Sequence, residues 1–270
     1  MRALWTALSL ALLSASPLTA QEAARPEIRA FDLRTTEQLG AAIYRQDSAA
    51  WVASDALQAE VSDLANAKLV GWIVVDAADG QKVRFLRRVD GRLEAGYDVD
   101  VSPALKTRLY APVDRALTAS EVAMFAARTT ASANLAGQPV CRPGYNTVVL
   151  KDPQGDGWLA WLLAPMPAAN VVPVGGHYRF TISADGLKML RRDALSASCM
   201  TMDPRQDLPA GAAPAGIGLT HVVSPTPTEV HVFLQLQSRL PMMIGAGGRM
   251  WTIDQGSIID RGPISASAKR

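Results

Sequence analysis

The sequence predicts an α+β protein with a long N-terminal helix, an antiparallel β-meander, a second helix and a largely antiparallel β C-terminal half. Three observations predict this class. Apolar residues recur every three, four or seven positions over 36–66, and the period changes to two near residue 69. After residue 140, clusters of Gly, Pro and Asp separate short apolar runs, which is typical of strands joined by turns.

The N-terminus has the layout of a secretory signal peptide. Arg2 gives a short positive region, residues 3–13 form an apolar run, and small residues end at Ala20. The apolar run is far shorter than the ~20 residues that cross a bilayer. We therefore expect cleavage of residues 1–20, no integral membrane segment after cleavage, and a periplasmic or secreted protein.

The composition excludes some classes of function. The chain of 270 residues carries 27 basic and 25 acidic side chains, and its scattered basic residues do not provide the concentrated positive field that nucleic acid requires. Sequence motifs of phosphate-binding loops and of the common secreted hydrolases are absent from the sequence. No nucleic-acid partner is expected.

The chain contains two cysteines, Cys141 and Cys199, and they do not form a C-x-x-C pair. In an oxidising compartment we expect them to form a disulfide bond. The alternatives that the sequence leaves open are a nucleophilic cysteine and two unpaired thiols.

The first half contains two helical patterns around a meander. Residues 36–66 form one long helix, or two with a break near Asp47-Ser48, and Thr35 with Gln38 has the spacing of a capping box. A second capping box, Thr118 with Glu121, starts a helix over 119–132. The strands predicted between the helices are 69–76, 81–89 and 92–101.

The second half is predicted to be mainly β, with a long surface loop over 203–218. Its predicted strands are 145–151, 158–164, 177–183, 187–193, 219–223, 229–236 and 249–254. The predicted organisation is a signal peptide at 1–20, an α+β half at 21–137 and a mainly β half at 138–270. A single continuous domain is the alternative.

One group of residues has the chemistry of a metal site. If residues 219–223 and 229–236 form a hairpin around Thr226, His221 lies opposite His231, and Glu229 shares their face. Two imidazoles and a carboxylate are a known ligand set for catalytic zinc, and His177 offers a third imidazole. The competing hypothesis is a cross-strand His–Glu pair, or unconnected surface groups.

The leading functional hypothesis is a non-enzymatic periplasmic or secreted module. Such a module would hold a peptide, a glycan or an envelope protein on an exposed sheet face or edge strand. The alternative is a metal-assisted hydrolase that uses zinc at His221, Glu229 and His231. The sequence does not decide between these two hypotheses. It also does not identify the ligand, the substrate or the oligomeric state.

Overall fold

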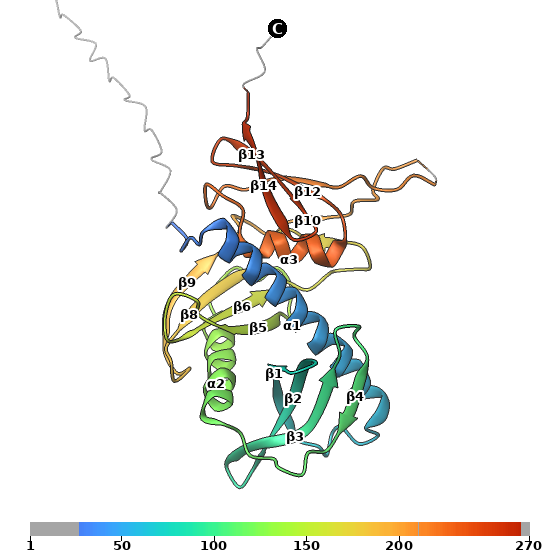
Figure 1. Ribbon diagram of the computed structural model, residues 1–270, viewed down its shortest axis with the longest axis vertical. Coiled ribbons are helices and arrows are strands. Elements are labelled where there is room, and N and C mark those ends of the chain that lie inside the picture. Colours follow the sequence, from blue (N-terminus) through green and yellow to red (C-terminus); the bar gives the residue numbers. More distant parts are fainter. Residues whose placement is uncertain (1–26, 210, 266–270) are drawn as a thin grey trace, which may run out of the picture.

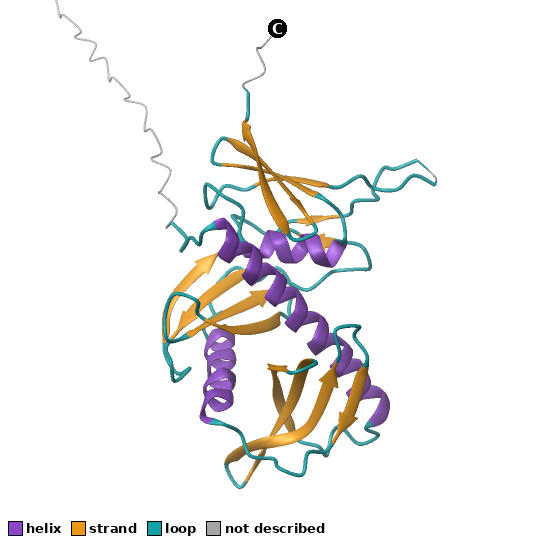
Figure 2. Ribbon diagram, in the orientation of Figure 1, coloured by secondary structure: helices purple, strands orange, loops and turns teal. Residues whose placement is uncertain are grey.

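The computed structural model describes residues 27–209 and 211–265, so the predicted signal peptide lies outside the described residues. The predicted α+β class is confirmed (Figure 2). The helices are α1 (Leu33–Glu60), α2 (Ala119–Ala133) and α3 (Glu229–Ser238). The strands are β1 (Leu69–Ala77), β2 (Gly80–Val89), β3 (Arg92–Val101), β4 (Thr107–Tyr110), β5 (Asn146–Lys151), β6 (Trp158–Leu163), β7 (Val172–Pro173), β8 (Tyr178–Ile182), β9 (Met189–Ala194), β10 (Thr201–Met202), β11 (Ile217–Thr220), β12 (Met242–Ala246), β13 (Arg249–Asp254) and β14 (Ser257–Pro263).

The long helix α1 runs from α3 at one end to β4 at the other (Figure 1). It begins earlier than predicted, because the Asp32 carboxylate accepts the Thr35 N–H at 2.8 Å and so provides the N-cap. The capping box predicted at Thr35 and Gln38 is therefore wrong. The helix continues through Asp47-Ser48 without a break and ends at Glu60.

The meander forms a sheet of order β1-β2-β3-β4, which adds one strand to the three predicted. One face packs on the C-terminal half of α1 through a cluster that includes Ala53, Val74, Val83 and Val99. The connection to the next sheet is α2, whose predicted capping box is confirmed. The Glu121 N–H donates to Thr118 Oγ1 at 3.2 Å, and the Thr118 N–H donates to Glu121 Oε2 at 2.7 Å.

The second sheet has the order β5-β6-β8-β9, which confirms four predicted strands with small changes at their ends. Helices pack on both faces of this sheet. Trp158 packs toward α2, whereas Trp161 packs toward α1 and α3, and both indoles are fully buried. Because α2 packs on this sheet, the helix belongs with the second half of the chain as much as with the first. The predicted boundary at 137/138 stays a prediction.

The third sheet has the order β11-β12-β13-β14. The predicted strand 249–254 is confirmed as β13, and β11 overlaps the predicted strand 219–223, but the predicted strand 229–236 is wrong. Residues 229–238 form α3 rather than a strand, and β11 pairs in parallel with β12. The reason is that Val230, Val232, Phe233 and Leu234 are all buried, since α3 is surrounded by core. A helix that is buried over most of its length shows the same run of apolar residues as a buried strand.

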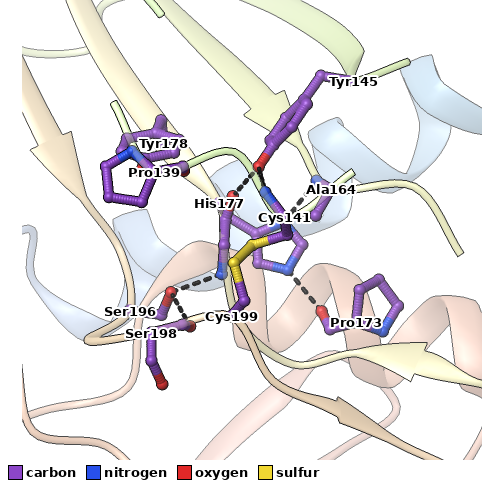
Figure 3. The surroundings of a disulfide bond; sticks show 11 residues. Pro139, Cys141, Tyr145, Ala164, Pro173, His177, Tyr178, Ser196, Ser198 and Cys199 are labelled. Atoms are coloured by element: carbon purple, nitrogen blue, oxygen red, sulfur yellow. Dashed lines mark hydrogen bonds between the residues drawn. A yellow bond between two sulfur atoms is a disulfide. The ribbon is translucent and has the colours of Figure 1, made fainter. Parts of the chain in front are cut away.

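The predicted disulfide Cys141–Cys199 is present, with a Cα–Cα separation of 5.5 Å. It joins the segment before β5 to the segment after β9 (Figure 3). Tyr145 lies against it, with its Oη accepting the Cys141 N–H at 3.3 Å and donating to the Gly176 carbonyl at 2.9 Å.

Among the described helices, none is long and apolar enough to span a bilayer.

Candidate functional site

The structure brings His221 and His231 together without the predicted hairpin. His221 follows β11, His231 lies in the first turn of α3, and their ring centroids are 4.6 Å apart with the ring planes at 88°. The segment between them turns from the sheet into the helix. Proximity of these two imidazoles therefore arises at a helix N-terminus and not across a β-ladder.

Hydrogen bonds occupy most of the imidazole nitrogens. His231 Nδ1 accepts the Thr228 N–H at 2.9 Å, in the place that a Glu or Gln side chain takes in a capping box. His221 Nε2 lies 2.8 Å from Ser224 Oγ, whose own proton goes to the Thr226 carbonyl at 2.5 Å. His221 Nε2 is therefore the donor in that bond, because the serine proton is already used.

His177 is held in the same way next to the disulfide (Figure 3). Its Nδ1 accepts the Ala164 N–H at 3.1 Å, and its Nε2 donates to the Pro173 carbonyl at 2.6 Å. Burial lowers the pKa of His177 and of His221 to about 4. Burial and the neighbouring His221 hold the pKa of His231 well below 6.5.

Glu229 lies in a buried ion network, and none of its described hydrogen bonds goes to a histidine. Its Oε1 accepts the Trp161 indole N–H at 2.8 Å and the Arg179 Nη1–H at 2.9 Å. Arg179 also pairs with Asp193 at 2.8 Å, and the three charged side chains are at most 2% exposed. This network fixes α3 against the second sheet, so Glu229 has a structural role.

These four residues do not form a metal-ligand set. Of the three neutral imidazoles, only His221 keeps a ring nitrogen, Nδ1, whose lone pair accepts no described hydrogen bond. Across residues 27–209 and 211–265, no group of three or more His, Cys, Asp or Glu side chains is placed to hold a metal ion. A zinc site needs three or four such donors, and this geometry gives no support to the predicted cluster.

A different site lies where two sheets turn their edges toward each other. The first edge is β1, which pairs with β2 on one side only. The two-residue turn makes Ala77–Gly80 a hydrogen-bonded pair. Hydrogen-bonded and non-hydrogen-bonded pairs alternate along an antiparallel ladder, so the N–H and C=O of Trp72, Val74 and Asp76 point away from β2. A bond of 3.5 Å from Gln46 Nε2 to the Val74 carbonyl agrees with this direction.

The second edge is β5, which pairs only with β6. The Asp152 N–H donates to the Gly157 carbonyl at 3.1 Å, and from that pair the alternation directs the backbone groups of Thr147, Val149 and Lys151 outward. Arg128 Nη1 donates to the Thr147 carbonyl at 3.0 Å, which agrees with this direction.

The two edges line a wedge-shaped cleft, which we call the β1–β5 cleft. At its narrow end, Trp72 and Val74 face Thr147 and Val149 around a cavity of about 10 Å³. Arg128 closes this end, with its guanidinium 3.8 Å from the Trp72 ring centroid. The Trp72 indole N–H is buried there without a described partner.

At the open end the cavity widens to about 530 Å³, within the usual range for ligand sites. Its walls are the 74–76 segment of β1 and the 149–151 segment of β5, and Met124 of α2 contributes a further side. The floor is one face of α1, formed by Thr35, Gln38, Leu39, Ala42, Arg45 and Gln46.

The charges at the open end favour an anionic ligand. Arg45 on the floor and Lys151 on the β5 wall are both exposed, and Asp76 is the single acidic residue among those that line this cavity. Within the described part of the chain, none of the three takes part in an ion pair. The lining therefore carries a net positive charge that the protein itself leaves uncompensated.

Comparisons with known proteins do not assign the chain to a family. No protein-family model, no curated protein and no solved structure matches it.

The sequence predicts both strands of this site but not their positions in the sheets. Whether a strand is an edge depends on long-range pairing, which local periodicity does not contain. One signal was available in β1, where residues 69–75 lack the Lys or Pro that commonly protects an edge strand. An unprotected apolar edge is typically covered or used for binding.

Proposed function

We propose that the protein is an exported binding module that holds an extended peptide segment of a partner against β1, inside the β1–β5 cleft. The observation that carries this proposal is the pair of free edges facing each other across a cavity of about 530 Å³. An extended segment that adds to a sheet edge gains main-chain hydrogen bonds whatever its sequence. The Val74 N–H and the outward N–H and C=O of Asp76 are placed to form them, whereas the Val74 carbonyl already accepts Gln46 Nε2.

The location of the module is part of the proposal. The signal-peptide pattern at 1–20 and the disulfide Cys141–Cys199 both support export to an oxidising compartment. The net positive lining supports a segment that carries carboxylates, with Arg45 and Lys151 as their contacts. An extended acidic segment of another envelope or secreted protein is the ligand that fits these features.

A displayed library of random peptides tests this function directly. We expect the wild-type protein to select acidic, extended sequences, whose synthetic versions then bind in fluorescence anisotropy. Asp76→Pro removes an outward N–H without removing a bond to β2, so it should raise the Kd at least about tenfold, or about 1.4 kcal/mol. Asp76→Asn, which keeps the N–H, should have a smaller effect.

The matched control is Thr107→Pro on β4. Thr107 is exposed, begins its strand and lies on the opposite edge of the same sheet. It should bind the selected peptides as tightly as the wild type. If Asp76→Pro unfolds, Arg45→Glu on α1 provides a second test and should also weaken binding about tenfold. Peptides that bind a folded Asp76→Pro or the Arg45→Glu variant with unchanged Kd would overturn the proposal.

A further inference from the structure

A second hollow opens next to the β1–β5 cleft, on the side of the meander that faces α1. Arg45 and Asp76 line both cavities, so the hollow lies beside the open end of the cleft. It has a volume of about 240 Å³ and lies between α1 and the ends of β2 and β3. Tyr44 and Ala49 of α1 line one side of the hollow, and Val101, Pro103 and Leu105 line the other.

We propose that this hollow receives one apolar side chain of the bound segment, which makes it the specificity pocket of the module. This inference rests on the proposed function. The volume lies below the ~300–1,000 Å³ that drug-sized ligands occupy, so it suits one side chain. Side chains of a strand alternate between the two faces of a sheet, so every second residue of a segment on β1 points toward α1.

Leu105 at the rim of the hollow provides an independent observation. It is 40% exposed and has a φ of 58°, a left-handed conformation that leucine rarely adopts. The turn holds it there through the Leu105 N–H to the Ser102 carbonyl at 2.8 Å and the Ser102 N–H to the Lys106 carbonyl at 3.0 Å. For the turn alone, Gly or Asn would suit this position better.

The ligand chemistry follows from the two cavities together. Arg45 stands where the cleft meets the hollow, it is exposed, and no described side chain pairs with it. A carboxylate of the bound segment would complement this charge. The segment that fits is therefore extended, with an apolar anchor residue close to an acidic residue.

A double-mutant cycle between Leu105 and the anchor residue of a selected acidic peptide tests the pocket. Replacing the peptide's apolar anchor by Ala should weaken binding to the wild-type protein about tenfold. Leu105→Asn removes an apolar wall but suits the left-handed backbone, so Tm should stay the same or rise. In this variant the loss caused by the anchor substitution should fall to about twofold.

The control is Leu187→Asn, which replaces an exposed leucine of the β8–β9 connection and should keep the full tenfold difference. An equal anchor effect in the wild type and in Leu105→Asn would overturn the specificity pocket. If that result occurs while Asp76→Pro still weakens binding, the pocket alone fails. If a folded Asp76→Pro or the Arg45→Glu variant binds the same peptide with unchanged Kd, the proposed function fails as well.

Discussion

Val74 of β1 and Val149 of β5 line the same two cavities from edge strands of different sheets. Each is 6% exposed, and each directs its backbone groups toward the opposite edge. The cavity at this pair is about 10 Å³ on the Trp72 side and about 530 Å³ on the side of Asp76 and Lys151. The outward main-chain groups of Asp76 and Lys151 therefore lie at the open end of the cleft.

Breaking the buried ion network should destabilise the fold strongly. Glu229→Ala leaves Arg179 without one of its two buried carboxylates, and removal of one partner of a buried pair costs about 3–5 kcal/mol. Glu94→Ala, which removes a half-exposed partner of Arg87, should cost less than about 1 kcal/mol. Urea unfolding of both variants measures the difference, and equal losses would contradict a structural role for Glu229.

The contact between Gly176 and the disulfide predicts a specific substitution effect. Gly176 has a φ of 90°, and a Cβ there would overlap Cys141 Sγ. Gly144, with a φ of 86°, has open space around its Cα. Gly144→Ala should cost about 1 kcal/mol for the backbone alone, and Gly176→Ala at least about 2 kcal/mol more.

The same two variants in a Cys141→Ala/Cys199→Ala background identify the cause. Removal of both sulfurs relieves the overlap at Gly176, so the two glycine substitutions should then cost nearly the same. A difference that persists in this background would show that the disulfide is not what Gly176 accommodates. Denaturant unfolding at neutral pH provides all of the free energies.

Stability should fall as the pH is lowered from about 6.5 to 4. The pKa of His177 and His221 is about 4 in the folded protein, against 6.5 for an unperturbed histidine. The unfolded state therefore binds more protons in this window, and each histidine contributes a loss of roughly 3 kcal/mol toward its acidic end. Asp47 opposes this loss of stability, because burial raises its pKa to about 6 in the folded protein. Its carboxylate therefore takes up a proton at a higher pH in the folded state than in the unfolded state.

His177→Gln tests this pH dependence at one position. A glutamine amide can accept from the Ala164 N–H and donate to the Pro173 carbonyl without titrating. The variant should lose less stability than the wild type between pH 6.5 and 4, measured by urea unfolding. An unchanged slope would mean that His177 does not contribute to the acid sensitivity.

The hydrogen bonds of the histidines also predict weak metal binding. Because a single imidazole lone pair of His221 is left over, isothermal titration with zinc should show no saturable one-to-one binding at micromolar concentrations. His221→Ala and His231→Ala should not change the titration. One-to-one zinc binding that both substitutions abolish would restore the metal hypothesis for this pair.

The elements that local patterns determine were predicted well. The capping box at Thr118, the period-two pattern of the meander and the turn residues between the strands of the second sheet depend on neighbouring residues, and the structure contains the elements that they predict. The cysteine pair followed from the expected oxidising compartment. In contrast, α3 was misassigned, because Val230 to Leu234 are buried on every side and show no amphipathic period.

The candidate site depended on information that local sequence does not contain. Both β1 and β5 were predicted as strands, but their status as facing edges arises from the sheet orders. The proximity of His221 and His231 was anticipated from a hairpin that does not exist. Their hydrogen bonds, which decide what they can bind, come from the turn between β11 and α3 and had no signal in the spacing.

Amide hydrogen exchange at Val74 and Asp76 tests the central claim most directly. These outward N–H groups have no described backbone partner, so in the free protein they should exchange faster than those of Ile73 and Val75, which face β2. With a saturating selected peptide, NMR-detected exchange at Val74 and Asp76 should slow at least about tenfold, with Thr107 on the opposite edge unchanged. Unchanged exchange at both positions while anisotropy shows the peptide bound would contradict strand addition at β1.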